Sequence, residues 1–404
     1  MAPNARSSRP LWPDDGPAGP SEAAPRWVVY VDLDAYYVAC ELRDRPDLVG
    51  LPVIVGPPPA AGPSRGVVLS ASYEARAFGV HSALPVRTAA ALCPSAVWIP
   101  PDFPKYERVS REVRALLARH APEVVPFSID EAALVVDAPS AEAAREVAAR
   151  VQRELRESLG LPASFGVATT RLVAKIATDK AKPGGIVVVP PDDVARFVAP
   201  LPVRAVPGVG PKTEERLVAL GYRTVGDFAG KRPADVVRSL GELGRELIRL
   251  ADGTPEEGPT VASGPRSRST DRTFTADVAS WPELEATIRA LAADLATSLE
   301  QEEIRYGSVG VAFRWADFAR SQRVRALAAA QEGAAALAER AVHLGRELWD
   351  AERAGRARSV RTVSVRVERL RDRRQRQVLL DDFSSGGRPG LNTRSGSDER
   401  SRDR

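Results

Sequence analysis

The sequence has few of the residues on which thiol chemistry and zinc sites depend. Two cysteines, Cys40 and Cys93, occur in 404 residues, which is too few for a disulfide framework or a four-cysteine zinc site. The three histidines, His81, His120 and His343, stand far apart and form no HExxH motif. A histidine-based zinc protease is therefore excluded. The chemistry of the chain must depend on carboxylates, hydroxyls and cations.

Long apolar runs are also missing. No stretch approaches the roughly 18 residues of a membrane span, and the first residues, MAPNARSSRPLWPDDGP, lack the apolar core of a signal peptide. We therefore expect a cytoplasmic protein with no membrane partner. Hydrophobic residues make up 44% of the chain and charged residues 27%, a globular balance that excludes wholesale disorder. The length predicts about two to four domains.

Positive charge is concentrated rather than abundant. The formal net charge is +4, and lysine supplies six of the 57 basic residues, so arginine supplies the rest. The segment 353–376 contains ten arginines against Glu368 and Asp372. Such a block is either a solvated or disordered arm or a surface that neutralises phosphates, and the second use makes nucleic acid the leading partner.

The first half of the chain predicts an α/β or α+β core. Residues 1–25 are rich in Pro, Ala, Ser and Gly and resemble a disordered arm. Order is expected from Arg26, where RWVVYVDLDAYY predicts one buried strand. Further strands are predicted at 51–56, 66–72, 123–128, 132–137 and 163–168, and helices near 104–119 and 140–159. Such an alternation with short links favours a layered core.

The second half predicts a helical region and then a separate unit. Glycine-punctuated helices are expected from 191 to 258, and 254–269 is low in apolar residues, as linkers are. Apolar residues recur at helical spacing over 284–299 and 337–348, and at period two over 309–315 and 363–367. Four strands and two helices in this order predict a sheet with both helices on one face. The tail from about 371 is again disorder-like.

Two acidic pairs are candidates for a metal site. Asp32 and Asp34 end the first strand, where residues two apart share a face, and Asp130 and Glu131 lie between apolar segments. Acids embedded in apolar strands are costly unless something positive neutralises them. They are either solvated strand-end residues or ligands of a shared divalent ion such as Mg²⁺, the ion that phosphoryl transfer requires.

Several other residues suit phosphate binding. Tyr73 and Arg76 are three residues apart in a predicted helix, so a hydroxyl and a guanidinium share one face. Lys175, Asp179 and Lys182 share another helical face. Lys182 precedes a Pro-Gly-Gly break, so its charge also suits a helix C-terminus without any ligand.

The segment VPGVGPKTEERLVALGYRTVGDFA has the form of a helix-hairpin-helix. Gly208 and Gly210 allow a partner backbone to come close, and the helix expected from Pro211 offers free N–H groups to a phosphate. A plain helical hairpin with a glycine turn is the alternative.

Taken in order, these segments resemble the Y-family DNA polymerases, the lesion-bypass class, and within it the DinB or polymerase IV-like branch. The resemblance runs from Trp27 to Leu370. It lies in VDLDAYYVACE, SASYEARAFGV, FSIDEA, KIATDKAKPGG and VPGVG, and is weaker after residue 265, where RSRSTDRTF and the order of elements carry it.

The resemblance implies a template-directed DNA polymerase that adds dNTPs to a primer 3′-OH by two-metal nucleotidyl transfer, acts distributively and does not proofread. The metal ligands, and with them the catalytic residues, would be Asp32, Asp130 and Glu131, with the backbone carbonyl of Leu33 as a further ligand. Two Mg²⁺ ions are expected, with Mn²⁺ as a substitute. Asp34 is not a metal ligand in the family, so the resemblance argues against a metal site shared by Asp32 and Asp34.

Further roles follow from the resemblance. Tyr73, Arg76 and Lys182 match the residues that hold the incoming triphosphate, and Tyr37 matches the steric gate that excludes ribonucleotides, with Tyr36 as a packing residue. The hairpin residues Gly208, Gly210 and Lys212 would contact the DNA.

The implied fold is an α+β, multidomain right hand: a palm with a mixed sheet and helices, small fingers, a helical thumb and a βαββαβ-like little finger. The expected parts are a disordered arm (1–25), the palm (26–35 and 102–190), the fingers (36–101), the thumb with its helix-hairpin-helix (191–258), a linker (259–265), the little finger (266–370) and a disordered tail (371–404).

The chain departs from the family pattern at three places. Ala133 stands where tyrosine is usual, Thr169-Thr170-Arg171 replaces Ser-Asn-Lys, and His81 and Ala83 stand where a basic residue and glycine are common. None of these changes removes a metal ligand or a phosphate cation, so activity is expected.

A sliding-clamp peptide is a further expectation, because Gln377, Leu380 and Phe383 in the tail loosely fit the Gln-hydrophobic-aromatic pattern of many relatives. We expect a monomer. Two rival functions are a catalytically inactive DNA-binding scaffold, which predicts a lost carboxylate, and a two-metal nuclease, against which Tyr73, Arg76 and Lys182 speak.

Overall fold

The computed structural model describes residues 25–59, 65–254, 266–353 and 357–372, and the chain divides into two compact units, Met1–Ala262 and Ser263–Arg404. The expected disordered arm apart from Pro25, the linker 259–265, and the tail from residue 373 with its clamp residues Gln377, Leu380 and Phe383 lie outside the described residues.

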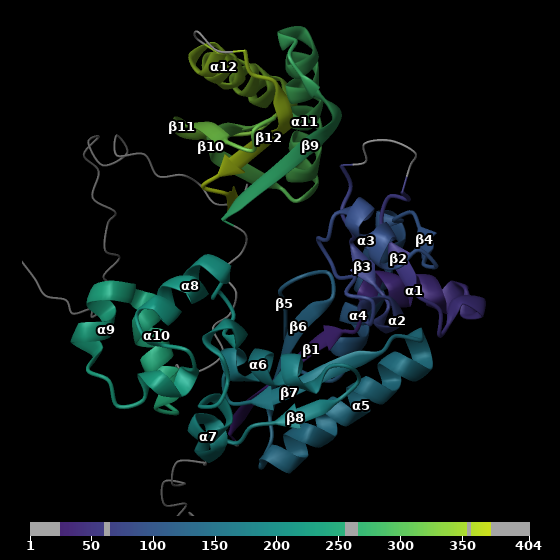
Figure 1. Cartoon of the computed structure of the whole chain (residues 1–404), viewed down its shortest axis with the longest axis vertical. Helices are drawn as coiled ribbons and strands as arrows, with labels where there is room; N and C mark the ends of the chain where they lie inside the picture. The colour runs from purple at the N-terminus through teal and green to yellow at the C-terminus, as the bar shows by residue number, and fades with distance from the viewer. Residues whose placement is uncertain (1–24, 60–64, 255–265, 354–356, 373–404) are drawn as a thin grey trace, which may run out of the picture. The chain divides into compact units, whose positions relative to one another are not determined.

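The first unit combines two sheets with helices (Figure 1). Its strands are β1 (Arg26–Leu33), β2 (Val53–Val55), β3 (Ser70–Ala71), β4 (Val97–Ile99), β5 (Glu123–Pro126), β6 (Glu131–Asp137), β7 (Ala163–Ala168) and β8 (Ile186–Val188). Its α-helices are α1 (Tyr36–Asp44), α2 (Tyr73–Arg76), α3 (Val86–Leu92), α4 (Phe103–Leu117), α5 (Ala141–Leu159), α6 (Arg171–Ala181), α7 (Val194–Val198), α8 (Pro211–Ala219), α9 (Pro233–Leu240) and α10 (Glu242–Ala251).

The larger sheet has the order β5-β6-β1-β7-β8, with only the β7–β8 pair parallel. Its central strand, β1, is buried on both faces, which explains its nearly continuous apolar sequence. Val29 and Val31 pack with residues of α4 and α5. Val28 and Tyr30, on the other face, pack with residues of α6. The mixed sheet expected for the palm is therefore present, with helices on both sides.

Two strand predictions were too long. The strand expected to include DAYY ends at Leu33, because Ala35 takes a left-handed conformation (φ 47°) and α1 begins at Tyr36. The strand expected over 66–72 is reduced to Ser70–Ala71, since Ser72 caps α2 by accepting a hydrogen bond from the Ala75 backbone N–H. The first change places Tyr36 and Tyr37 on a helix, whereas Tyr73 and Arg76 lie on a helix as predicted.

The region from 191 onward is helical, as predicted. It holds α7 to α10 and the 3-10 turns Pro191–Asp193, Val203–Ala205 and Val225–Phe228. Helix α8 begins at Pro211, directly after Gly210, and Gly208 has a φ of 92° that favours glycine. The glycine turn of the predicted hairpin therefore has the conformation that its sequence requires.

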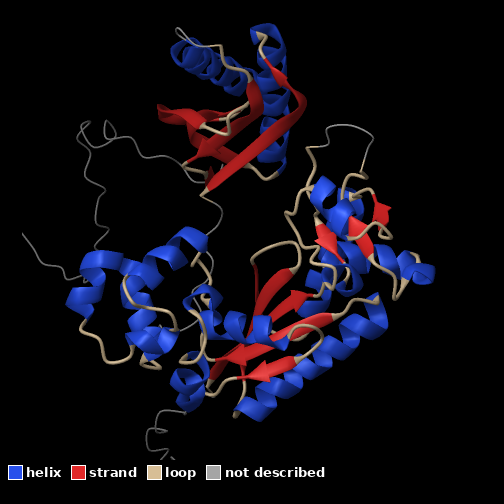
Figure 2. Cartoon of the chain, viewed as in Figure 1, coloured by secondary structure: helices blue, strands red, loops and turns tan. Residues whose placement is uncertain are grey.

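The second unit is a βαββαβ domain made of β9 (Ser267–Val278), α11 (Trp281–Gln301), β10 (Ile304–Trp315), β11 (Arg320–Gln331), α12 (Ala334–Arg353), β12 (Val360–Glu368) and β13 (Arg371–Asp372). The main sheet has the order β11-β10-β12-β9. Alternate strand residues, such as Val311 and Val365, share a core with α11 and α12, so both helices cover one face (Figure 2). This confirms the predicted arrangement. Two boundaries were wrong. The apolar-poor stretch 254–269 was too long for a linker, because residues 267–269 begin β9, although the linker assigned to 259–265 ends before it. The disordered tail was expected from 371, but Arg371 and Asp372 form β13 and pair with β10.

No helix in the described ranges has the length and apolar character needed to cross a membrane.

Candidate active site

Two of the three candidate metal ligands face each other across neighbouring strands. Asp32 on β1 is the register partner of Glu131 on β6. Asp32 is buried, Glu131 is half-buried, and their carboxyl groups share a hydrogen bond. Two acids side by side in the interior require positive charge nearby.

Two lysines supply that charge, one inside helix α6 and one at its C-terminal cap, and α6 packs on β7 and β1. Lys175 Nζ lies 3.1 Å from Asp32 Oδ2 and also bonds Glu131 Oε1. Lys182, the residue that caps the C-terminus of α6, lies 2.7 Å from Asp32 Oδ2. Asp179 is 3.5 Å from Lys175 and 3.8 Å from Lys182, so the helical face predicted for Lys175, Asp179 and Lys182 is confirmed.

Burial and the neighbouring charges shift the pKa values of Asp32, Glu131 and Lys175. Burial raises the pKa of Glu131, and the hydrogen bond shared with Asp32 raises it further. Burial acts in the same direction on Asp32, but the hydrogen bond with Glu131 and the Lys182 charge outweigh it and hold the pKa of Asp32 below its usual range. Burial acts to lower the pKa of Lys175, but its bond with Glu131 and the charge of Asp32 raise it instead. Asp32 is thus held ionised and Lys175 protonated.

The third candidate ligand, Asp130, points elsewhere. Its carboxylate accepts a hydrogen bond from Ser128 Oγ, while its backbone carbonyl accepts one from Leu33 N–H at 3.0 Å. Across the residues that the structure describes, no three acidic, histidine or cysteine side chains gather closely enough to hold one metal ion. Asp32 and Glu131 nevertheless offer paired carboxylate oxygens, the ligands that a hard divalent cation prefers.

Asp34 belongs to a separate, structural cluster, so the same-face pairing with Asp32 was wrong. Because β1 ends at Leu33, the alternation of the strand does not continue to Asp34. Its buried carboxylate accepts hydrogen bonds from Ser164 Oγ (2.9 Å), the Gly184 backbone N–H (2.9 Å) and Tyr73 Oη (3.2 Å). Asp34 therefore ties α2 to β7 and to the turn after α6.

The candidate phosphate ligands surround this cluster. The Arg76 guanidinium lies 4.7 Å from the centre of the Tyr73 ring, which confirms that the two share one face of α2. Burial and the nearby Asp34 carboxylate raise the pKa of Tyr73 to about 12, so its hydroxyl stays a hydrogen-bond donor. Lys182 Nζ bonds Asp32 Oδ2, so this lysine links the carboxylates to the expected triphosphate site.

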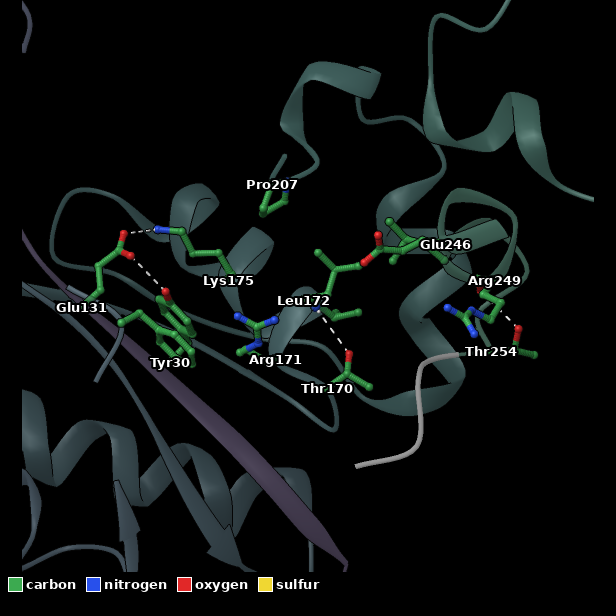
Figure 3. A pocket seen from close by; sticks show the side chains of 13 residues that line it. Tyr30, Glu131, Thr170, Arg171, Leu172, Lys175, Pro207, Glu246, Arg249 and Thr254 are labelled. Carbon is green, nitrogen blue, oxygen red and sulfur yellow. Dashed lines mark hydrogen bonds and ion pairs between the residues drawn. The ribbon is translucent and has the colours of Figure 1, made fainter. Parts of the chain in front are cut away.

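A cavity of about 360 Å³ opens beside Glu131 and Lys175 (Figure 3). Its walls come from Tyr30, from the start of α6 and from the helical region, where Pro207 and α10 contribute. Tyr30 donates a hydrogen bond to Glu131 Oε2 at 3.0 Å, and Lys175 Nζ lies 5.2 Å from the centre of the Tyr30 ring. The cavity therefore joins the carboxylates to the hairpin region of the same unit.

The remaining candidates occupy α1 and the hairpin. Tyr37 is half-buried, and burial together with the charge of Asp130 raises the pKa of its hydroxyl. Tyr36 is buried and donates a hydrogen bond to the Tyr106 carbonyl at 2.6 Å, as expected of a packing residue. Gly208 and Gly210 have open space where a side chain would stand, and Lys212 is exposed on α8.

Two residues of this site were not predicted as site residues. Lys175 was noticed for its helical face with Asp179 and Lys182, but its bonds to both carboxylates follow only from the packing of α6 on the sheet. Nothing in the sequence marks Tyr30 as more than an aromatic residue of a predicted strand. Its period-two relation to Asp32 on β1 does place the two on one face, and that relation is the clue that could have found it.

Family models match most of the chain. The impB/mucB/samB family model matches residues 31–179, the model of its C-terminal domain matches 265–380, and the IMS family HHH motif matches 191–222. The last match coincides with the predicted helix-hairpin-helix.

Individual proteins give the same picture. The chain is 41% identical over 361 residues to DNA polymerase IV of Methanoculleus marisnigri, covering 89% of this chain and 99% of that protein. It is 43% identical over 255 residues to DNA polymerase IV of Stenotrophomonas maltophilia strain K279a, covering 63% and 69%. Among solved structures, a Y-family DNA polymerase chimera is similar with a TM-score of 0.78 at 26% identity, covering 86% of this chain and 99% of that one. The crystal structure of DinB from Sulfolobus solfataricus is similar with a TM-score of 0.59 at 25% identity, covering 85% and 98%.

Proposed function

The chain belongs to the impB/mucB/samB family, the DinB-like Y-family DNA polymerases, and from that premise we propose how its residues carry out translesion DNA synthesis. It is a DNA-directed DNA polymerase of the class that acts in DNA damage and repair. We propose that it adds dNTPs to the 3′-OH of a primer on a template, distributively and without proofreading.

The observation that carries the proposal is the buried pair Asp32 and Glu131, neutralised by Lys175 and Lys182. Polymerases of this family depend on divalent metal ions, and we infer two Mg²⁺, replaceable by Mn²⁺, held by Asp32, Asp130, Glu131 and the carbonyl of Leu33. Bound there, the ions would activate the attacking 3′-OH and stabilise the leaving pyrophosphate. Asp130 joins this set once its side chain leaves Ser128.

The chain's own residues then position the substrate. Lys182, Arg76 and Tyr73 would neutralise and orient the triphosphate, and the hydrogen bonds of Asp34 hold Tyr73 in place for that task. Lys182 and Lys175 help to keep Asp32 ionised, and Lys175 holds the Glu131 carboxylate in place. Tyr37 would stand under the sugar and exclude a 2′-OH by overlap.

The parts of the right hand are assigned accordingly. We propose a palm of residues 26–35 and 102–190, fingers of 36–101, a thumb of 191–258 and a little finger of 266–370. Gly208, Gly210 and Lys212 would approach the phosphates of the duplex, which holds DNA without reading its sequence. We further propose a cytoplasmic monomer whose tail engages the sliding clamp through Gln377, Leu380 and Phe383.

The test is primer extension on a primed template with Mg²⁺ and single dNTPs. Asp130→Ala should abolish template-directed addition, because it removes a metal ligand. Asp137→Ala is the matched control, since Asp137 is an acid at the far end of the same strand, β6. Wild-type protein that binds the DNA but adds no nucleotide would favour the scaffold instead, and degradation of the primer would favour the nuclease.

A further inference from the structure

The proposed gate residue, Tyr37, rests against other aromatic rings. It lies in the first turn of α1, and the centre of its ring is 4.6 Å from that of Tyr106 and 6.3 Å from that of Phe103. The Tyr106 ring is tilted by 33° to it, and the Phe103 ring meets it edge-on. Both partners lie on α4, so the position of the gate depends on how α4 is held.

Tyr106 is fully buried, and its hydroxyl is tied to a buried charge pair. Tyr106 Oη donates a hydrogen bond to Glu41 Oε1 at 2.7 Å, and Glu41 Oε2 accepts one from Lys105 Nζ at 2.8 Å. Lys105 also lies 2.7 Å from Asp44 Oδ2. Burial acts to lower the pKa of Lys105, but its bonds to Asp44 and Glu41 raise it, so the ammonium form persists.

A buried ion pair between α1 and α4 adds little net stability, because both charges lose their hydration when they are buried. Glu41 and Lys105 are 7% and 8% exposed, and apolar residues of the same volume would often stabilise such a site as well or better. The pair does hold the Glu41 carboxylate in place: Lys105 binds Oε2, while Oε1 accepts the hydrogen bond from Tyr106. The network therefore fixes the orientation of the Tyr106 ring.

Fixed orientation matters for a gate that works by overlap. Tyr37 can exclude a 2′-OH only if its ring does not move back when the hydroxyl presses on it. A small retreat relieves the clash, because repulsion falls steeply with distance, and one methylene of misfit is worth only about 10- to 200-fold in discrimination. The ring that supports Tyr37 therefore determines how strongly the site discriminates against a ribonucleotide.

We propose that Tyr106 is a positioning residue for sugar selection: held by Glu41 and Lys105, it stops Tyr37 from retreating when a ribonucleotide enters. This inference rests on the proposed function, in which Tyr37 is the gate.

The experiment measures single-turnover insertion of a dNTP and of the matching rNTP by the full-length protein with Mg²⁺. Tyr106→Leu removes the supporting ring and should lower the preference for the dNTP by about tenfold or more, with a smaller effect on dNTP insertion itself. Tyr222→Leu is the matched control, since Tyr222 is another stacked tyrosine of the same unit, 4.2 Å from Phe228. It should leave the preference unchanged.

Tyr106→Phe keeps the ring but removes its hydroxyl, and Glu41→Gln keeps an acceptor but weakens both the hydrogen bond with Tyr106 and the contact with Lys105. Each should lower the preference severalfold, and the double variant should do little more than Glu41→Gln alone, because both changes act on the Tyr106–Glu41 hydrogen bond. These variants decide the question if Tyr106→Leu does not fold, which thermal melting would reveal.

Equal changes in the rates of dNTP and rNTP insertion in these variants would overturn the inference, because a residue that only stabilises the fold affects both rates alike. Tyr37→Ala separates it from the proposed function. If Tyr37→Ala lowers the preference but the Tyr106 and Glu41 variants do not, only the inference fails. If Tyr37→Ala leaves the preference unchanged, the gate assignment fails and the inference with it.

Discussion

At the scale of the residue, Ala133, which stands where tyrosine is usual in the family, lies beside an aromatic residue of the neighbouring strand. The small side chain is the register partner of Tyr30, and both are buried in the same cluster on the face of the sheet that α6 covers. Tyr30 stacks on Phe127 with ring centres 5.6 Å apart and reaches Glu131 with its hydroxyl. Tyr30 thus places a ring beside the small residue at position 133, and its hydroxyl bonds Glu131, one of the carboxylates proposed as metal ligands.

Replacing Tyr30 with phenylalanine tests this role. The change keeps the ring and its stacking but removes the hydrogen bond to Glu131, so the carboxylate loses one of its fixed contacts. Bonds to charged groups are the stronger ones, and we expect the rate of dNTP addition to fall by about tenfold, measured by primer extension at fixed Mg²⁺. Tyr306→Phe in the second unit is the control. A wild-type rate in Tyr30→Phe would show that Lys175 alone holds Glu131.

Site residues could be predicted from the sequence where a charged residue stands in an apolar strand or where the spacing puts charged residues on one helical face. Asp32 and Glu131 are charged residues in apolar strands, and the spacing of Lys175 and Lys182 marked a common face. The role of Asp34 was not predictable from spacing, because it depends on the end of β1 at Leu33 and on the left-handed conformation of Ala35. A backbone reversal of this kind leaves no periodic signal in a run such as VDLDAYY.

At the scale of the element, long periodic segments were predicted best. Helices α4, α5, α11 and α12 and strand β7 lie close to their expected ranges, since apolar periodicity and caps act over many residues. The shorter elements were missed or overextended. Strand β3 has two residues, and its predicted length was lost to the Ser72 cap of α2. Local capping thus outweighed β propensity.

Capping also yields a pH prediction in the helical region. The Asp227 carboxylate accepts hydrogen bonds from the backbone N–H groups of Thr224 (2.8 Å) and Arg223 (2.7 Å), which hold its pKa below the usual range. A lowered folded-state pKa gives stability that is complete above the usual Asp pKa and is lost as the pH falls through the lower value. We expect Asp227→Ala to lower the melting temperature at pH 7 by about 2 °C or more.

That difference from the wild type should shrink as the pH falls below about 4, because the protonated carboxyl no longer stabilises the turn. Thermal melting of both proteins from pH 7 to pH 3 measures it. Asp227→Asn, which keeps a neutral acceptor, should lie between the two at pH 7. A difference that stays constant over this range would mean that packing, not the charge, accounts for the effect.

At the scale of the whole molecule, a net charge of +4 on 404 residues is small, so affinity for DNA must come from local groups of cations. In the second unit, strand register puts Arg314, Arg320 and Arg366 on the face opposite the helices. Arg323 and Arg325 lie on the helix side, where Glu347 of α12 pairs with both. Arginines of one sheet therefore divide into a helix-paired set and a set on the open face.

The two sets should differ in the salt dependence of DNA binding. Arg366 is left out of the test because it already pairs with Glu368 at 3.0 Å. Each phosphate contact adds about 0.9 to the slope of log affinity against log salt, so replacing Arg314 and Arg320 with alanine should reduce the magnitude of this slope by about 2. Arg323→Ala with Arg325→Ala should change it much less, because those guanidinium groups are already paired. Fluorescence anisotropy of a labelled primer–template over a salt series measures both. Equal slopes in the two variants would mean that the open face of this sheet does not contact the duplex, and that the thumb, with Lys212, supplies the phosphate contacts.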